Sequence, residues 1–353
     1  MSALILRYGV ISGVIYWLNS GHKGSGIMKI AILSESFLIG GLETRLKSMA
    51  KYIIQQGHEV CLITQRMDGS AHTSLPFKTI YIVNFDNAES VKAALMAASP
   101  DVADIHPFSS IPTGATACRE LDIPYSVTIH GVYMNSNYVL HLQNADRVFA
   151  VSEEVKTQVL RFAPGLNVTI LKNGVDMETF RPVDIGRQFC IAYISRLDTN
   201  KKNGIIHAAG LVAQKPGAKL HIIGNGPVEG ELRQILPTVE FRGYVEDIAG
   251  YFRDNTGVYS AVGGMGRAIV EGMAMKMPVV IMSYDGAKGH VTPFNFYDFA
   301  RNNFSGRGMP NIERLSDLNT DYTEALYEMV CEEYDIRKIT EEYLSIASKM
   351  IRS

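Results

Sequence analysis

Short runs of apolar residues alternate with amphipathic segments along most of the chain. Five apolar runs in the first half predict β-strands, at residues 29–33, 59–64, 79–83, 125–129 and 147–151. Between the first two runs, apolar side chains recur every three or four positions from Leu42 to Ile54, which predicts one helix that ends at Gly57. Parallel strands covered by helices produce this alternation, so we expect an α/β fold.

The same pattern starts again near residue 189. Apolar runs predict a second set of strands at residues 189–195, 219–223, 239–241, 258–262 and 278–282. The segment 168–188 contains Asn-Gly, proline and charged residues, which indicates a linker between two domains. We therefore expect two doubly wound domains, residues 28–180 and 181–353, with a cleft at the carboxyl ends of their strands. Amphipathic helices after residue 320 are expected to close the second domain.

Residues 1–27 are interpreted as an apolar N-terminal extension and a linker. Residues 3–18 are apolar except for Arg7 and Ser12, but they are fewer than the roughly 20 residues of a membrane-spanning helix. The features of a secretory signal are also missing. Three interpretations stay open: an interfacial anchor, a helix packed on the body of the protein, and an upstream extension without functional weight.

Length, charge and cysteine content narrow the class of protein. A chain of 353 residues is long enough for two hydrophobic cores. The formal net charge is −2 and neither half is basic, which argues against a nucleic-acid partner. The four cysteines lack the spacing of a metal site and are expected to be reduced, buried thiols of a cytosolic protein. The sequence contains no P-loop, GxSxG, HExxH or DxD pattern, and we predict no metal and no cofactor.

In the first domain, the residues that follow two predicted strands could meet a ligand. Gly40 and Gly41 precede the helix that carries Glu43, and a helix N-terminus attracts negative charge. A loop capped by the acidic residue explains the same pattern. His130 ends another predicted strand and would face the same cleft, although a single histidine is more often a structural residue.

Cations and glycines also follow two predicted strands of the second domain. Arg196, Lys201 and Lys202 come after the first of them, and such cations suit a diphosphate, which arginine binds through two hydrogen bonds. Gly224 and Gly226 follow the next strand, where a glycine turn can hold a phosphate. A solvated basic loop and an ordinary turn are the alternatives.

The most informative segment is a glycine-rich turn at residues 263–267, ahead of a helix that carries Glu271. Glycines leave backbone N–H groups open at the positive end of the helix dipole, which makes an anion site without a metal. The Glu271 carboxylate could accept hydrogen bonds from the vicinal hydroxyls of a ribose. The alternative is a surface ion pair between Glu271 and Arg267, four residues earlier. We favour the binding role, because glycine weakens such a turn unless a ligand must come close.

Together these pieces resemble the retaining GT-B glycosyltransferases of glycosyltransferase family 4, the group 1 glycosyl transferases. The resemblance extends from about Met28 to Val330. In the first half it rests on MKIAILSESFLIGGLETRLKSMAKYIIQQGHEVCLIT, PDVADIH, VTIHG, FAVSEEVK and the interdomain segment LKNGVDMETFRP. In the second half it rests on YISRLDTNKKNG, KLHIIGNGP, VEFRGYVED and GRAIVEGMAMKMPVV. The number, order and spacing of these motifs make the match specific.

The resemblance implies a role for each candidate residue. Arg196 and Lys201 would hold the donor diphosphate, and Glu271 would hold the ribose of the nucleotide. Gly41 and His130 would face the donor sugar and the acceptor from the first domain. Other residues of the second domain would border the donor: Gly224, Gly226, Gly264, Met265 and Gly266 near its phosphates and sugar, and Tyr244 and Val245 near its base.

The resemblance also implies the reaction. A nucleotide-diphosphate sugar, expected to be a UDP-sugar, would donate its sugar to a glycan or a lipid-linked acceptor, as in polysaccharide biosynthesis. The transfer would retain the anomeric configuration and would need no metal. The protein is expected in the cytoplasm, at the inner face of the membrane if residues 3–18 act as an anchor.

One position departs from the motif of the family, in which seven residues separate two glutamates. Glu271 is the second glutamate, whereas Gly263 stands at the first position. This departure suggests one alternative, a catalytically impaired, donor-binding partner subunit. A sugar-nucleotide epimerase on the same fold is a further alternative, which the linker and the Gly-Met-Gly-Arg motif disfavour. Arg307 belongs to a segment, 303–308, without a counterpart in the family; it could line the site, but we expect it in an exposed loop.

Overall fold

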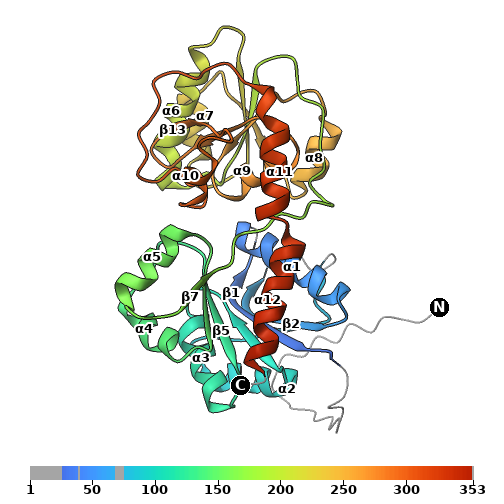
Figure 1. Cartoon of the computed structure of the whole chain (residues 1–353). Helices are drawn as coiled ribbons and strands as arrows, with labels where there is room; N and C mark the ends of the chain where they lie inside the picture. The colour runs from blue at the N-terminus through green and yellow to red at the C-terminus, as the bar shows by residue number, and fades with distance from the viewer. Residues whose placement is uncertain (1–25, 39, 68–74, 352–353) are drawn as a thin grey trace, which may run out of the picture.

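The structure, a computed structural model, describes residues 26–38, 40–67 and 75–351. The three interpretations of residues 3–18 therefore concern a segment outside the described residues. The described chain folds into two α/β domains, drawn one above the other in Figure 1. Within the described ranges, every helix is too short or too polar to span a membrane.

The first domain is built on a seven-stranded parallel sheet in the order β3-β2-β1-β4-β5-β6-β7. Its strands are β1 (Lys29–Phe37), β2 (Glu59–Met67), β3 (Thr79–Ile82), β4 (Val102–Ile105), β5 (Tyr125–Ile129), β6 (Arg147–Ala150) and β7 (Val168–Ile170). Its helices are α1 (Gly41–Gln55), α2 (Ala88–Ala98), α3 (Ser110–Glu120), α4 (Ser136–Gln143) and α5 (Glu153–Phe162). Apolar side chains form two buried clusters between the sheet and these helices. The doubly wound α/β fold predicted from the apolar runs is confirmed.

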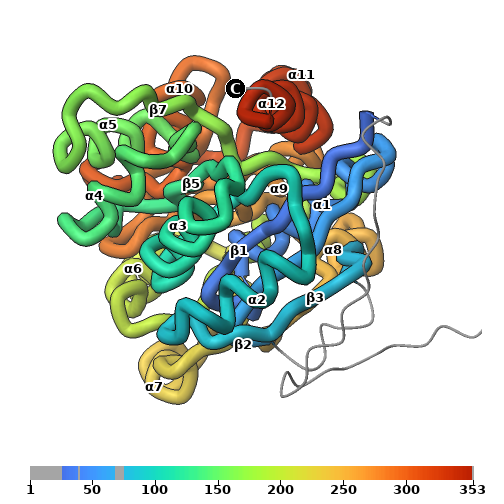
Figure 2. Tube along the Cα trace, turned by 90° about the horizontal axis from the view of Figure 1, so that it is seen from below, coloured from blue at the N-terminus to red at the C-terminus, as the bar shows by residue number. Residues whose placement is uncertain are grey.

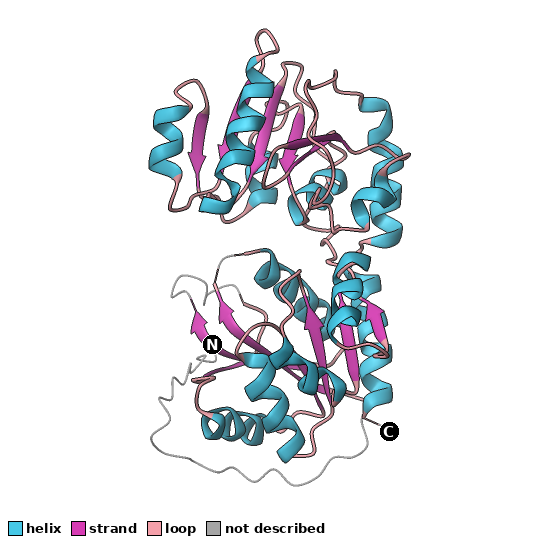
Figure 3. Ribbon diagram, turned by 90° about the vertical axis from the view of Figure 1, so that its left-hand side faces the viewer, coloured by secondary structure: helices cyan, strands magenta, loops and turns pink. Residues whose placement is uncertain are grey.

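The second domain has a six-stranded sheet in the order β10-β9-β8-β11-β12-β13, in which only β13 is antiparallel to its neighbour. Its strands are β8 (Cys190–Ile194), β9 (Lys219–Ile223), β10 (Glu240–Gly243), β11 (Ala261–Gly264), β12 (Val279–Met282) and β13 (Ala287–His290). Its helices are α6 (Lys202–Ala213), α7 (Glu229–Ile235), α8 (Ile248–Asp254), α9 (Arg267–Ala274), α10 (Phe296–Ala300) and α11 (Thr323–Glu333), with 3-10 turns η2 (Thr199–Lys201) and η3 (Thr320–Tyr322). Figure 3 shows the parallel strands of each sheet pointing toward the other domain. Loops at their carboxyl ends therefore meet at the domain interface.

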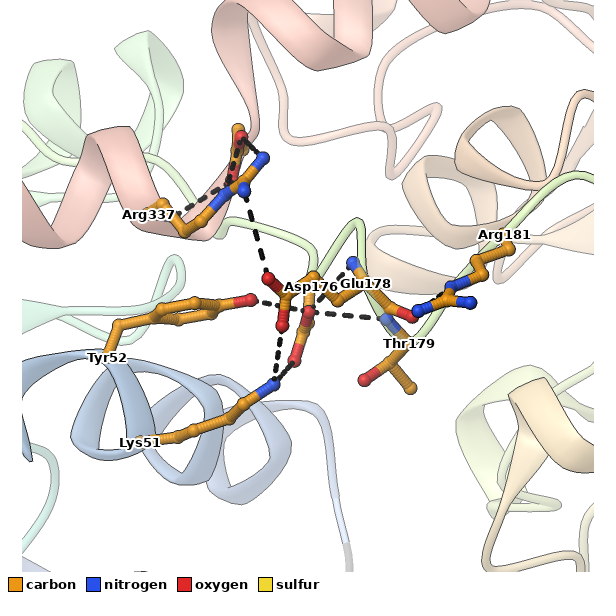
Figure 4. Close-up of polar contacts among 8 residues, drawn as sticks. Lys51, Tyr52, Asp176, Glu178, Thr179, Arg181 and Arg337 are labelled. Carbon is orange, nitrogen blue, oxygen red and sulfur yellow. Dashed lines mark hydrogen bonds and ion pairs between the residues drawn. The ribbon is translucent and has the colours of Figure 1, made fainter. Parts of the chain in front are cut away.

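Residues 171–189 join β7 to β8 and overlap the predicted linker. Asp176 anchors this linker to α1, because its carboxylate accepts hydrogen bonds from Lys51 Nζ at 2.9 Å and from the Tyr52 hydroxyl at 2.8 Å (Figure 4). The same carboxylate accepts bonds from the backbone N–H groups two and three residues later, at 3.0 and 3.3 Å. The turn that results sends Phe180 into the core of the second domain.

The last two helices pack on different domains. α11 buries Leu326 and Val330 in the core of the second domain. The final helix, α12 (Ile336–Met350), instead packs beside α1, and its residues Tyr343 and Leu344 join the apolar cluster of the first domain. Figure 1 shows red α11 on the second domain and α12 below it on the first, and in Figure 2, seen from below, the two helices overlap. We expected both helices on the second domain; an amphipathic pattern predicts a buried face but not the surface that buries it.

The strand predicted at residues 258–262 begins and ends later, as β11. Gly263 and Gly264 therefore belong to the strand, and not to the turn that follows it. A Cβ atom on Gly263 would lie 2.6 Å from Met282 Sδ and 3.0 Å from Ile191 Cγ2, so glycine fits here because of strand packing. No side chain of residue 263 could reach the domain interface without rearrangement of this core.

Candidate functional site

Two neighbouring strands of the second sheet end side by side at the domain interface. β8 and β11 are parallel, and Ile194 pairs with Gly264 at their carboxyl ends. Gly264 has a φ of 150° and Gly266 a φ of 60°. A Cβ atom on Gly264 would also lie 2.8 Å from the carbonyl oxygen of Ile194. Glycine is therefore required where β11 turns into α9.

Arg196 and Lys201 lie together just beyond the end of β8. Arg196 Nε is 3.0 Å from Asp198 Oδ1, and Lys201 Nζ is 3.8 Å from Asp198 Oδ2. Burial lowers the pKa of the Lys201 ammonium, opposed by Asp198 and assisted by the charge of Arg196. Lys202 forms an ion pair with Glu231 instead. Lys201, rather than Lys202, therefore shares a site with Arg196.

Glu271 forms an ion pair with Arg267 on α9. Arg267 Nη2 is 2.8 Å from Glu271 Oε1, at the i, i+4 spacing that the sequence indicates. The pair is not on the surface, because the two side chains are only 10% and 9% exposed. Burial raises the pKa of Glu271, although Arg267 opposes this shift. Among the described residues, no hydrogen bond or ion pair joins Glu271 to Arg196 or Lys201.

Arg267 also reaches from the second domain to the linker and the first domain. Its Nη1 donates a hydrogen bond to the carbonyl oxygen of Gly174 at 2.6 Å. A Cβ atom on Gly41 would lie 3.2 Å from Arg267 Cδ. Gly41, which was expected to face a ligand, therefore faces this arginine, and the sequence motifs assign no such contact to Arg267.

Glu43 accounts for Gly40, the glycine that precedes α1. A Cβ atom on Gly40 would lie 2.5 Å from Glu43 Oε2. Burial raises the pKa of Glu43, and the charge of Arg196 in the other domain opposes this shift. The backbone N–H groups of Glu43 and Leu38 favour the charged form of the carboxylate and so also act to lower its pKa. The interpretation as a loop capped by an acidic residue is thus supported, and the capping carboxylate lies within the field of Arg196.

Two buried polar side chains, Asp104 and His106, lead to the half-buried His130. Asp104 Oδ2 is 3.2 Å from His106 Nε2, and His106 Nδ1 is 2.9 Å from His130 Nε2. Asp104 Oδ1 also accepts hydrogen bonds from Ser126 at 2.8 Å and Thr128 at 3.1 Å. Burial alone would raise the pKa of Asp104, but His106 and other partners hold it below its ordinary value. Burial lowers the pKa of His130, and repulsion from His106 in its protonated form lowers it further.

Arg45 of α1 is buried beside this chain of polar groups. Its side-chain nitrogens have no hydrogen-bond partner among the described residues. Burial lowers the pKa of Arg45 to about 10, with Asp104 opposing and Arg267 assisting this shift. The sequence motifs assign no role to Arg45, Asp104 or His106, because only their burial reveals them.

Backbone packing explains the glycines after β9. A Cβ atom on Gly224 would lie 2.0 Å from the carbonyl oxygen of Ser195, and one on Gly226 would lie 2.4 Å from that of Leu197. The N–H group of Gly224 already donates to the carbonyl oxygen of Gly243 at 2.7 Å. Gly224 thus offers no free N–H to a phosphate, contrary to the role suggested by the sequence.

Both domains match models of known protein families. Residues 39–179 match the model described as Glycosyltransferase Family 4, and residues 188–295 match the model described as Glycosyl transferases group 1. The chain belongs to the group 1 glycosyltransferases. The family resemblance predicted from the sequence motifs is therefore confirmed.

Solved structures share the fold of this glycosyltransferase. The glycosyltransferase from Rickettsia africae superposes with a TM-score of 0.67 at 18% identity, and the match covers 93% of this chain and 100% of that one. HepE from Anabaena, solved in complex with UDP-glucose, superposes with a TM-score of 0.70 at 17% identity, over 92% and 100% of the two chains. An uncharacterized glycosyltransferase of Methanocaldococcus jannaschii is 22% identical, and the match covers 73% of this chain and 81% of that one. The fold is GT-B.

Only some of the residues predicted for the site of this glycosyltransferase lie close to one another. Arg196, Lys201 and the turn at residues 264–266 meet at the ends of β8 and β11. Tyr244, which is 40% exposed, and Val245 follow the end of β10, two strands away from β8. Within residues 26–38, 40–67 and 75–351, no group of three or more histidines, cysteines or acidic residues could hold a metal ion.

Proposed function

We propose that this glycosyltransferase transfers a sugar from a UDP-sugar to a glycan or a lipid-linked acceptor. The observation that carries the proposal is the placement of Arg196, Lys201 and the glycine turn at the ends of two adjacent strands. Cations and a helix N-terminus at one place suit a diphosphate. HepE, which shares the fold, was solved with UDP-glucose, and this supports a UDP-linked donor.

Transfer of the sugar requires the diphosphate to leave. The bond between the anomeric carbon and the phosphate oxygen breaks, while negative charge grows on the diphosphate and positive charge on the carbon. Arg196 and Lys201 would lower the barrier because they stabilise the leaving diphosphate more strongly as its charge grows. In the retaining reaction, the acceptor oxygen attacks from the face that the diphosphate leaves, and a departing phosphate oxygen takes the proton of the acceptor hydroxyl. This scheme needs neither a protein nucleophile nor a metal ion.

Other residues complete the proposed site. Glu271 Oε2 accepts no hydrogen bond from the described residues and would be the oxygen available to a ribose hydroxyl. The backbone of Tyr244 and Val245 would meet the base. His130 would face the donor sugar and the acceptor from the first domain. Closure of the two domains over the donor would exclude water and limit hydrolysis.

The two adjacent lysines allow a matched test. We expect K201A and R196A to lower the rate of UDP release from UDP-glucose by about 100-fold or more, as when a transition-state donor is removed. K202A removes the same charge from the next residue, which pairs with Glu231, and should leave the rate within about twofold of the wild type. Coupled detection of UDP, with thermal unfolding as a check of folding, measures both effects. Equal rates for K201A and K202A would show that the assignment is wrong.

Donor binding without turnover is the competing function. The packing of Gly263 against Met282 favours it, since the first acidic position of the family motif cannot carry a side chain here. Calorimetry that shows UDP-glucose binding, together with no UDP release over a panel of acceptors, would select this function. Sustained UDP release would exclude it.

A further inference from the structure

A cavity of about 580 Å³ lies between α5 of the first domain and the end of α10 in the second. Its wall on the first domain includes Glu154, Thr157, Gln158 and Arg161, which share one face of α5 at helical spacing. The opposite face of α5 buries Val155 and Val159. Because its apolar face is packed in the core, α5 turns its polar face to the cavity. The volume of the cavity suits a small molecule or one end of a larger one.

Three arginines line this cavity, from both domains. Arg161 ends α5, whereas Arg301 and Arg307 come from the segment after α10. Arg307 Nη1 pairs with Glu154 Oε2 at 2.6 Å. The side chains of Arg161 and Arg301 form no ion pair or hydrogen bond with any residue of the described ranges. One further carboxylate, Asp298, lines the cavity, so the arginines outnumber the acids.

The loop that carries Arg307 is held in place by its own contacts. Asn302, which is 9% exposed, donates a hydrogen bond from Nδ2 to the carbonyl oxygen of Arg307 at 3.1 Å. Ser283 donates to the carbonyl oxygen of Ser305 at 2.6 Å. The backbone N–H of Glu154 donates to the carbonyl oxygen of Arg301 at 3.0 Å, which joins the two walls. These contacts fix the backbone that carries Arg301 and Arg307, and Arg307 itself lies exposed in a loop, as expected from the sequence.

The cavity adjoins the proposed site of sugar transfer. The N–H of Gly266, in the turn beside Arg196, donates to the carbonyl oxygen of Phe304 at 3.0 Å, inside the segment that forms one wall. On the other side, Val132 lines the cavity and lies two residues after His130. A molecule in the cavity would thus contact one segment that includes His130 and another that is bonded to the glycine turn.

We propose that this cavity binds the acceptor of the reaction, and that the acceptor carries a phosphate or carboxylate group next to sugar or polyol hydroxyls. Arg161 and Arg301 are exposed at this cavity and have no side-chain partner among the described residues, so both guanidinium groups are available to an anion, whose phosphate or carboxylate oxygens they bind through paired hydrogen bonds. Thr157, Gln158 and Asp298 supply groups that can bind hydroxyls. The proposal rests on the proposed function, since it names the acceptor class of the same enzyme.

Three related probes can distinguish the contribution of the anionic group to binding from that of the sugar hydroxyls. Glucose 6-phosphate, glucuronate and glucose are titrated by calorimetry into the full-length protein saturated with UDP, so that the donor site is filled. We expect both anionic probes to bind at least about tenfold more tightly than glucose, because each charged hydrogen bond strengthens binding by a factor of this size. A stronger gain for one of them identifies phosphate or carboxylate as the group that the cavity selects.

A matched pair of double variants tests whether the arginines of the cavity cause the preference for anionic probes. R161Q/R301Q removes the two unpaired arginines of the cavity, one from each domain, and should abolish the preference for the anionic probes. R119Q/R314Q removes two exposed arginines elsewhere, again one from each domain, and should keep the preference, although the net charge changes equally. Equal binding of all three probes by the wild type, or equal losses in both variants, would overturn the proposal.

UDP binding is measured in the same titrations and reports on the proposed function independently. If UDP does not bind, the donor assignment fails, and the probes are then titrated into the protein alone. An anionic preference that R161Q/R301Q abolishes and R119Q/R314Q keeps would still support the cavity as an anion site. Binding of UDP without any anionic preference would overturn the inference and leave the proposed function intact.

Discussion

Asp104 sets the direction of the hydrogen bond between His106 and His130. The Asp104 carboxylate, 3.2 Å from His106 Nε2, favours the proton of a neutral His106 ring on that nitrogen, so that Nδ1 accepts the proton of His130 Nε2. His130 then presents Nδ1 as an acceptor on its other side. We therefore regard Asp104 and His106 as positioning residues for His130, which is proposed to face the sugar.

The D104N substitution should reverse the direction of the hydrogen bond between His106 and His130. The amide of D104N can still accept the bonds from Ser126 and Thr128, but its NH2 group would face His106 Nε2 and move the ring protons of both histidines. We expect the free energy of unfolding to fall by about 1–3 kcal/mol. UDP release should slow by about 10-fold or more, as for other side chains that orient a functional histidine, with little change in UDP-glucose affinity.

Nitrogen NMR of the histidine rings distinguishes the two tautomers directly. The control is T128V, which removes one bond to Asp104 but keeps the carboxylate, and it should change stability by about 1 kcal/mol and leave the tautomers unchanged. An unchanged His130 tautomer in D104N would refute the positioning role even if activity fell.

Individual residues of the site could be predicted from the sequence only where they directly follow a predicted strand. His130 and Arg196 follow clear apolar runs, and both lie at the domain interface. Asp104 lies inside β4, which the apolar pattern misses because a polar residue interrupts a four-residue strand. Its role depends on a buried contact with His106, and burial between elements has no local signal in the sequence.

At the scale of elements, the turn after β7 attaches the interdomain linker to α1 of the first domain. Asp176 is buried, and the hydrogen bond from Lys51 helps to hold the pKa of its carboxyl below the ordinary value, against the effect of burial. Glu178 also contacts Lys51, at 3.3 Å, but its side chain is 48% exposed. Asp176 and Glu178 therefore both pair with Lys51, but the first carboxylate is buried and the second is exposed to solvent.

The difference in burial predicts unequal effects of neutralising these acids. D176N should lower the free energy of unfolding by about 2 kcal/mol, because charged hydrogen bonds from Lys51 and Tyr52 are weakened. E178Q should change it by less than about 1 kcal/mol, as for exposed ion pairs. A carboxyl with a lowered pKa stabilises the fold above its unfolded pKa of roughly 4 and loses this contribution as the pH falls through its folded pKa. Urea unfolding at pH 7 and pH 3.5 should therefore show a smaller difference between D176N and wild type at the lower pH.

The elements themselves were largely predictable, but their partners were not. The apolar runs predict ten strands, whereas β4, β7 and β13 are missed; β4 and β13 have four residues each and β7 has three. β11 is displaced because Gly263 and Gly264 weaken its strand pattern. The periodicity of α12 predicts its apolar stripe, but the pairing with α1 depends on a surface of the other domain.

At the scale of the whole molecule, Arg267 couples the domains through a single side chain. One half of its guanidinium binds the linker at Gly174, and the other half compensates the buried charge of Glu271. Closure of the domains and neutralisation of a proposed donor-binding residue thus depend on the same group. A donor that took a hydrogen bond from Glu271 would alter the contact that holds the linker.

Removal of Arg267 should therefore loosen the molecule as well as destabilise it. R267A leaves Glu271 as an unpaired buried charge and should lower the free energy of unfolding by about 3 kcal/mol, while R267A/E271Q should recover part of this loss because the charge is gone. In R267A the already raised pKa of Glu271 should rise further, so its penalty shrinks as the pH falls through that folded pKa. Small-angle scattering should report a larger radius of gyration for both variants, since each lacks the bond to Gly174, whereas E271Q alone should keep the wild-type radius. If R267A and R267A/E271Q keep the wild-type radius, Arg267 stabilises α9 alone and does not hold the domains together.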